Sequence, residues 1–107
     1  MKNSSPKPPR HLSPEAKVLW RIALDLYDLD EVARSVLAVG LEAHDRMRQA
    51  QALLKRDGLI VVDRFNQQKP NPAAIIERDS RTSYVKCLHM LGLDLEPLQG
   101  PGRPAGK

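Results

Sequence analysis

The side chains in this sequence with the clearest chemistry are lysines and arginines, whose charge suits the phosphates of a polyanion. The chain has 17 of them against 13 Asp and Glu, a formal net charge of +4. Residues 12–98 hold 12 basic and 13 acidic residues, net −1, so the positive excess lies in the two ends. This distribution favours nucleic acid as a partner. The alternative is that a modest positive charge only keeps the protein soluble.

The candidate DNA-binding residues form two groups. The basic residues of the two ends would attract phosphates of any sequence: Lys2, Lys7, Arg10, Arg103 and Lys107. A second group lies on predicted helices within residues 46–93, a stretch that contains nine basic and four acidic residues. These are candidates for positioned contacts with the DNA backbone: Arg46, Arg48, Lys55, Arg56, Arg78 and Arg81.

Catalytic and metal-binding patterns are not evident in the sequence. Cys87 lies on the apolar face of a predicted helix and is expected to be a small core residue. His11, His44 and His89 have no metal-ligand spacing with it. There is no glycine-rich phosphate loop and no nucleophile with a neighbouring base. We therefore predict that the protein is not an enzyme and needs no metal or cofactor.

Helices are expected to position most of these residues. Ser13 suits an N-cap and Pro14 suits the first helical position, so a first helix is predicted to begin here and to end near Asp28. Its apolar residues recur at three- and four-residue spacing and form one face. Three charged residues form the opposite stripe, which is expected to face solvent: Lys17, Arg21 and Asp25.

A long second helix is predicted over residues 31–57, capped by Asp30 and ended by Gly58. At 1.5 Å per residue it spans about 40 Å, too long for the first helix alone to cover. A heptad stripe of mostly small residues would permit close helix packing. We expect the third helix and a second subunit to share the covering, and a monomer is the alternative. The proposed oligomer interface is Val36, Gly40, Ala43, Met47, Ala50 and Leu54.

The remaining chain is predicted to hold one short β-segment and one helix. The β-branched run at residues 59–63 predicts a strand, which could close a small hairpin by residue 69. Asn71 and Pro72 are predicted to begin a third helix that ends near Leu91. The fold class is therefore mainly α, a three-helix domain over residues 12–97. The proline- and glycine-rich ends, residues 1–11 and 98–107, are predicted to be flexible.

Three stretches of the sequence resemble parts of one known family. Residues 8–17, PPRHLSPEAK, followed by Leu19-Trp20, resemble the proline-rich opening and first helix of phage terminase small subunits. Residues 53–59, LLKRDGL, resemble the junction after that family's second helix. The motif KPNPA at 69–73, with LGL at 91–93 and Pro97, resembles its ending.

The resemblance implies a non-catalytic protein of phage genome packaging in the host cytoplasm. Such a protein binds double-stranded viral DNA at the packaging start site, oligomerises, and regulates the large subunit, which holds the ATPase and nuclease. The sequence leaves two alternatives open. An adaptor of the packaging motor that does not bind DNA is suggested by the acidic residues 25–45. A small helix-turn-helix regulator is suggested by the short connection at 28–30, although the second helix is too long for a typical recognition helix. No run of 18 apolar residues is present, so no transmembrane helix is expected.

Overall fold

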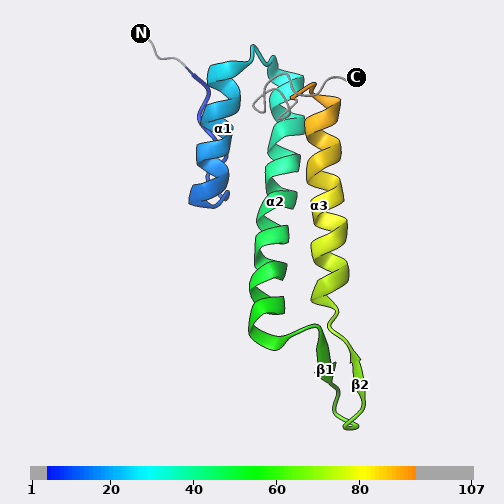
Figure 1. Ribbon diagram of the computed structural model, residues 1–107. Coiled ribbons are helices and arrows are strands. Elements are labelled where there is room, and N and C mark those ends of the chain that lie inside the picture. The colour runs from blue at the N-terminus through cyan, green and yellow to red at the C-terminus, as the bar shows by residue number, and fades with distance from the viewer. Residues whose placement is uncertain (1–4, 94–107) are drawn as a thin grey trace, which may run out of the picture.

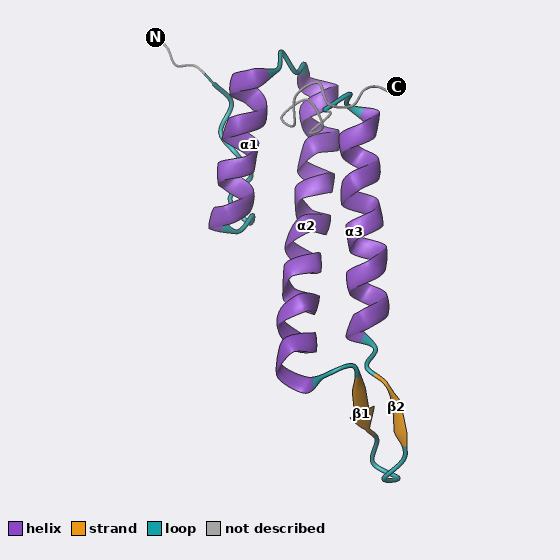
Figure 2. Cartoon of the chain, in the orientation of Figure 1, coloured by secondary structure: helices purple, strands orange, loops and turns teal. Residues whose placement is uncertain are grey.

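The computed structural model describes residues 5–93, which form three helices and one β-hairpin (Figure 1). In chain order these are α1 (Pro14–Leu26), α2 (Glu31–Asp57), β1 (Ile60–Val62), β2 (Gln68–Pro70) and α3 (Ala73–Met90). Helices α2 and α3 lie side by side, α1 lies beside the first part of α2, and the hairpin extends beyond the other end of the pair (Figures 1 and 2). The prediction of a mainly α fold with a long central helix and a small hairpin is confirmed.

The predicted capping residues begin the first two helices and end the second. The Ser13 hydroxyl accepts a hydrogen bond from the Ala16 amide at 3.0 Å, and an Asp30 carboxylate oxygen accepts one from the Ala33 amide at 2.8 Å. Each bond satisfies an amide that has no partner inside its helix. Gly58 ends α2 with φ at 84°, a left-handed conformation that favours glycine. Helix α1 ends two residues earlier than its sequence predicts.

Helix α3 begins at Ala73, one residue later than predicted, because Pro72 takes the N-cap position. The buried Asn71 still performs the expected capping, since its side-chain oxygen accepts a hydrogen bond from the Ala73 amide at 3.0 Å. The side-chain nitrogen of Asn71 also donates to the Gly58 carbonyl at 2.9 Å. One side chain thus joins the end of α2 to the start of α3 across the base of the hairpin.

The core lies where α1 packs on the first part of α2 and on the end of α3. Trp20 is its largest member and is 4% exposed. Its other buried residues are Leu12, Ala16, Ala23, Leu37, Leu41 and Leu93. Burial of these apolar side chains supplies the main driving force for holding α1 in place.

The small-residue stripe of α2 is covered mainly within the chain. Gly40, Ala43, Met47 and Ala50 are buried, and α3 runs along this part of α2 (Figure 1). A Cβ atom added at Gly40 would lie 2.8 Å from the Cβ of Cys87, so the two helices approach as closely as glycine allows. The burial of these four residues therefore needs no second subunit. The two remaining positions, at 36 and 54, are half-buried.

The hairpin confirms that the short strand has a return strand in the same chain. Strands β1 and β2 pair antiparallel, with Ile60 opposite Pro70, Val61 opposite Lys69 and Val62 opposite Gln68. The Asn71 amide extends the pairing by donating to the Leu59 carbonyl at 2.8 Å.

Candidate nucleic-acid interface

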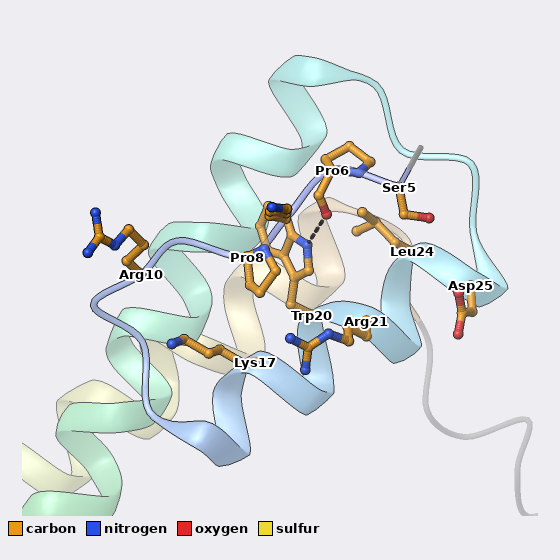
Figure 3. A pocket seen from close by; sticks show the side chains of 10 residues that line it. Ser5, Pro6, Pro8, Arg10, Lys17, Trp20, Arg21, Leu24 and Asp25 are labelled. Carbon is orange, nitrogen blue, oxygen red and sulfur yellow. Dashed lines mark hydrogen bonds between the residues drawn. The ribbon is translucent and has the colours of Figure 1, made fainter. Parts of the chain in front are cut away.

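The N-terminal segment 5–12 lies along α1 and forms a hollow with it (Figure 3). Two side-chain contacts hold this segment, which the sequence assigned largely to a flexible tail. The indole N–H of Trp20 donates to the Pro6 carbonyl at 3.0 Å, and His11 lies 2.7 Å from a carboxylate oxygen of Glu42 on α2. A buried indole N–H needs an acceptor, and the backbone of the segment supplies it. The hollow has a volume of about 500 Å³.

Positive charge dominates this hollow. Lys7 and Arg10 line it from the segment, and Lys17 and Arg21 line it from α1, where they are four residues apart and share a helix face. Asp25 is the one acidic residue among its lining side chains. Within residues 5–93, none of the four cations takes part in an ion pair. We call the hollow lined by these four residues the cationic pocket. Its excess of positive charge suits an anion.

The apolar part of the cationic pocket comes from residues between the cations. Trp20 and Leu24 of α1 line it together with Pro6 and Pro8 of the segment (Figure 3). The cations can contact the phosphates of a ligand. The apolar residues can pack against its less polar parts, which in a nucleic acid are the sugars.

The structure divides the predicted DNA-binding residues unevenly. Of the end residues, Lys7 and Arg10 lie in the cationic pocket, whereas Lys2, Arg103 and Lys107 lie outside the described residues. Of the helix-borne residues, Arg46 and Lys55 are exposed and have no ion pair in the described chain. Four others are engaged with carboxylates of the same chain: Arg48, Arg56, Arg78 and Arg81.

Two of these arginines belong to a network that joins all three helices. Arg48 of α2 donates to both carboxylate oxygens of Glu15 on α1, at 3.1 and 2.9 Å, and to the Gln51 side-chain oxygen at 2.9 Å. Gln51 donates to Glu77 of α3 at 3.0 Å, and Glu77 also pairs with Arg81. Arg48 thus joins α2 to α1, whereas Arg81 pairs within α3 with the carboxylate that Gln51 contacts. At either arginine, a phosphate would have to compete with a carboxylate that is already bound.

The pKa shifts in this network have the same origin. The hydrogen bond from Arg48 lowers the pKa of Glu15 below its ordinary value, and the bond to Glu15 raises the pKa of Arg48. Gln51, and secondarily Arg81, lower the pKa of Glu77. Both carboxylates therefore stay ionised to a lower pH than an ordinary glutamate does.

Sequence reasoning missed Lys17 and Arg21, which it assigned to the solvent-facing stripe of α1. Their spacing of four residues, on either side of Trp20 in sequence, was a usable signal for a shared positive surface. The return of segment 5–12 along α1, which adds Lys7 and Arg10, depends on tertiary contacts and had no local signal.

Among the described residues, no group of three or more His, Cys, Asp or Glu side chains is arranged to hold a metal ion. In the same part of the chain, no helix is long and apolar enough to span a membrane.

Comparison with known proteins identifies one family. The family profile described as "Phage terminase, small subunit" matches residues 16–97. No curated protein and no solved structure gives a significant match. The profile covers all three helices and the hairpin, apart from the first two residues of α1. The chain therefore belongs to the phage terminase small subunit family, whose role is in phage genome packaging.

Proposed function

We propose that this terminase small subunit binds double-stranded viral DNA at the packaging start site, using the cationic pocket for phosphate contacts. The observation that carries the proposal is that Lys7, Arg10, Lys17 and Arg21 surround one hollow and are not neutralised by ion pairs within residues 5–93. Four positive charges around one hollow favour a chain of phosphates, because binding releases the counterions condensed on DNA. This chain supplies no catalysis in the proposed role, and the large subunit is its packaging partner.

Salt dependence of DNA affinity tests the proposal. In the variant with Lys17→Ala and Arg21→Ala, two phosphate contacts are lost, so the slope of log affinity against log salt should become shallower by about 1.8. Binding should weaken on all duplex sequences. The matched control is Arg78→Ala, since Arg78 is exposed on α3 and already pairs with Asp79 at 3.3 Å. An unchanged slope in the double variant, with a wild-type thermal melt, would refute the pocket as the DNA contact.

We also propose that the protein assembles with copies of itself through the outer face of α2. The stripe predicted from sequence supports this only at its ends, Val36 and Leu54, because its four central residues are covered within the chain. Val32 and Val39 flank Val36 at helical spacing and are exposed, as is Leu53. Apolar residues on one helix face gain stability when a second copy removes them from water. Val39→Asp should then lower the molar mass measured by light scattering.

A specific observation favours the adaptor role as a second candidate. The end of α1, the connection after it and the start of α2 carry exposed acidic residues. In sequence they lie near Leu26 and Val32, which are 65% and 72% exposed. The acidic residues are Asp25, Asp28, Asp30 and Glu31. Such a surface suits a basic protein partner and repels DNA. Tight binding to the large subunit, unaffected by added DNA or by loss of the cationic pocket, would favour this candidate over the first.

A further inference from the structure

The β-hairpin projects away from the helices and presents its side chains to solvent. Figure 1 shows it beyond the end of the α2–α3 pair, and β1 and β2 pair mainly with each other. An isolated two-stranded hairpin is marginally stable in water, so a retained hairpin with exposed side chains suggests a binding partner. The cationic pocket does not include this part of the chain.

The tip of the hairpin has a defined shape, which Asp63 maintains. One carboxylate oxygen of Asp63 accepts hydrogen bonds from the amides of Phe65 and Gln67, at 2.8 and 3.0 Å. The Asp63 amide donates to the Gln67 carbonyl and the Asn66 amide donates to the Asp63 carbonyl, each at 2.9 Å. Asn66 takes a left-handed φ of 63°, which asparagine tolerates well. The negative charge of Asp63 is thus turned inward onto backbone amides.

The exposed tip carries residue types that proteins use in DNA grooves. Residues 64–69 read RFNQQK, and all six are exposed. In the described chain, neither Arg64 nor Lys69 has an ion pair. Phe65 is the chain's one phenylalanine and is 68% exposed, and the Arg64 guanidinium lies 5.0 Å from its ring centroid. Proteins that bind the minor groove use Arg, Lys, Asn and Gln there and often insert an apolar side chain between base pairs.

We propose that the hairpin tip enters the minor groove of duplex DNA, with Phe65 inserted between two base pairs and Arg64 beside it in the groove. This inference rests on the proposed DNA-binding function, and it adds a second, deforming contact to the phosphate contacts of the cationic pocket. Asn66, Gln67 and Gln68 line the same tip and can donate hydrogen bonds to the acceptors at the base edges in this groove. The inserted ring would bend the duplex by unstacking one base step.

Preference for a pre-opened base step distinguishes insertion from simple phosphate attraction. Inserting a side chain costs unstacking energy in intact DNA, and that cost is lower where a mismatch already weakens the stack. Affinity should therefore be compared on two duplexes of about 30 base pairs that differ only in a central two-base mismatch. The wild-type chain should bind the mismatched duplex about tenfold more tightly, with a bend reported by energy transfer between the duplex ends.

The variants separate the tip from the pocket. Phe65→Ala should abolish both the mismatch preference and the bend, and Phe65→Leu should retain most of both, because leucine also serves as a wedge. Met90→Ala is the matched control, since Met90 is 67% exposed but lies at the far end of α3 from the hairpin. The variant with Lys17→Ala and Arg21→Ala should bind both duplexes more weakly and keep the preference. Thermal melts and molar masses verify that each variant is folded and assembled as the wild type.

The outcomes are distinct. Loss of the preference in Phe65→Ala alone supports insertion at the tip. Equal binding of the two duplexes by the wild-type chain, or an unchanged preference in Phe65→Ala, overturns the inference and leaves the cationic pocket as the proposed DNA contact. A change of molar mass in Phe65→Ala, with DNA binding unaltered, also overturns it and assigns the tip to a protein interface. If the wild-type chain binds neither duplex, the proposed function and this inference both fail.

Discussion

Replacement of Gly40 by alanine should destabilise the protein by separating α2 from α3. The added Cβ would lie 2.8 Å from the Cβ and 3.5 Å from the Sγ of Cys87. Two carbon atoms prefer a separation near 3.5–4.0 Å, so about 1 Å of space is missing. Neither Cβ belongs to the flexible end of a side chain, so the two helices themselves must shift.

The size of this effect follows from two opposing terms. Overpacking of a tight interface costs about 1–3 kcal/mol. Alanine in place of glycine in a helix returns about 1 kcal/mol. The expected net loss is about 1 kcal/mol, equivalent to a melting temperature lower by about 4–8 °C for a domain of this size. Gly40→Val should lower the free energy of unfolding further, because valine adds more volume at the same position.

Thermal and urea unfolding at two protein concentrations provide the assay. Because the contact between Gly40 and Cys87 lies within one chain, the stability difference between variant and wild type should not depend on concentration. Val39→Ala is the control, since Val39 neighbours Gly40 but is exposed, and its effect should appear mainly in the molar mass. A Gly40→Ala variant that is more stable than the wild type would refute the close approach of α2 and α3. A loss that disappears on dilution would assign Gly40 to an interface between chains.

Two further predictions concern the attachment of α1 to α2. Ser13→Ala removes the acceptor of the Ala16 amide and the 2.6 Å hydrogen bond that the hydroxyl donates to Asp45, so it should lower the free energy of unfolding in urea by about 1–2 kcal/mol. The hydrogen bond from Arg48 lowers the pKa of Glu15 in the folded state. This pair therefore contributes stability above the unfolded carboxyl pKa of about 4.3, and the contribution is lost as the pH falls through the lower folded pKa. Arg48→Gln should reduce the acid-induced loss of stability, measured as the urea midpoint between about pH 6 and about pH 3; an unchanged acid profile would contradict it.

The helix termini were predictable because their signals are local. A capping side chain such as Asp30 satisfies an amide only three residues away, and the left-handed φ of Gly58 reflects a preference of the residue itself. The one shifted start, at α3, arises because Asn71 satisfies the Ala73 amide from outside the helix while Pro72 occupies the cap. In each case the interacting groups are close in sequence.

The partners of the charged and small residues were not predictable in the same way. Arg48 meets Glu15, 33 positions away, and that pairing exists only once α1 has packed on α2. The stripe around Gly40 predicted a close helix contact, but the pattern of small residues does not say whether the other helix belongs to the same chain. The contact with Cys87 supplies the partner for that position. The sequence therefore indicated that α2 packs closely against another helix, and tertiary packing determined which helix that is.

The arrangement of the two proposed DNA contacts limits how much DNA one chain can cover. The cationic pocket lies along α1, whereas the hairpin tip lies beyond the opposite end of the α2–α3 pair (Figure 1). The longest dimension of the molecule is 59 Å, which corresponds to at most about 17 base pairs at 3.4 Å per base pair. If both contacts act on one duplex that is straight up to the bend at the hairpin tip, a protected length greater than this requires a second copy of the chain. The proposed assembly through the outer face of α2 would leave α1 and the hairpin tip free, so it would be compatible with the proposed DNA binding.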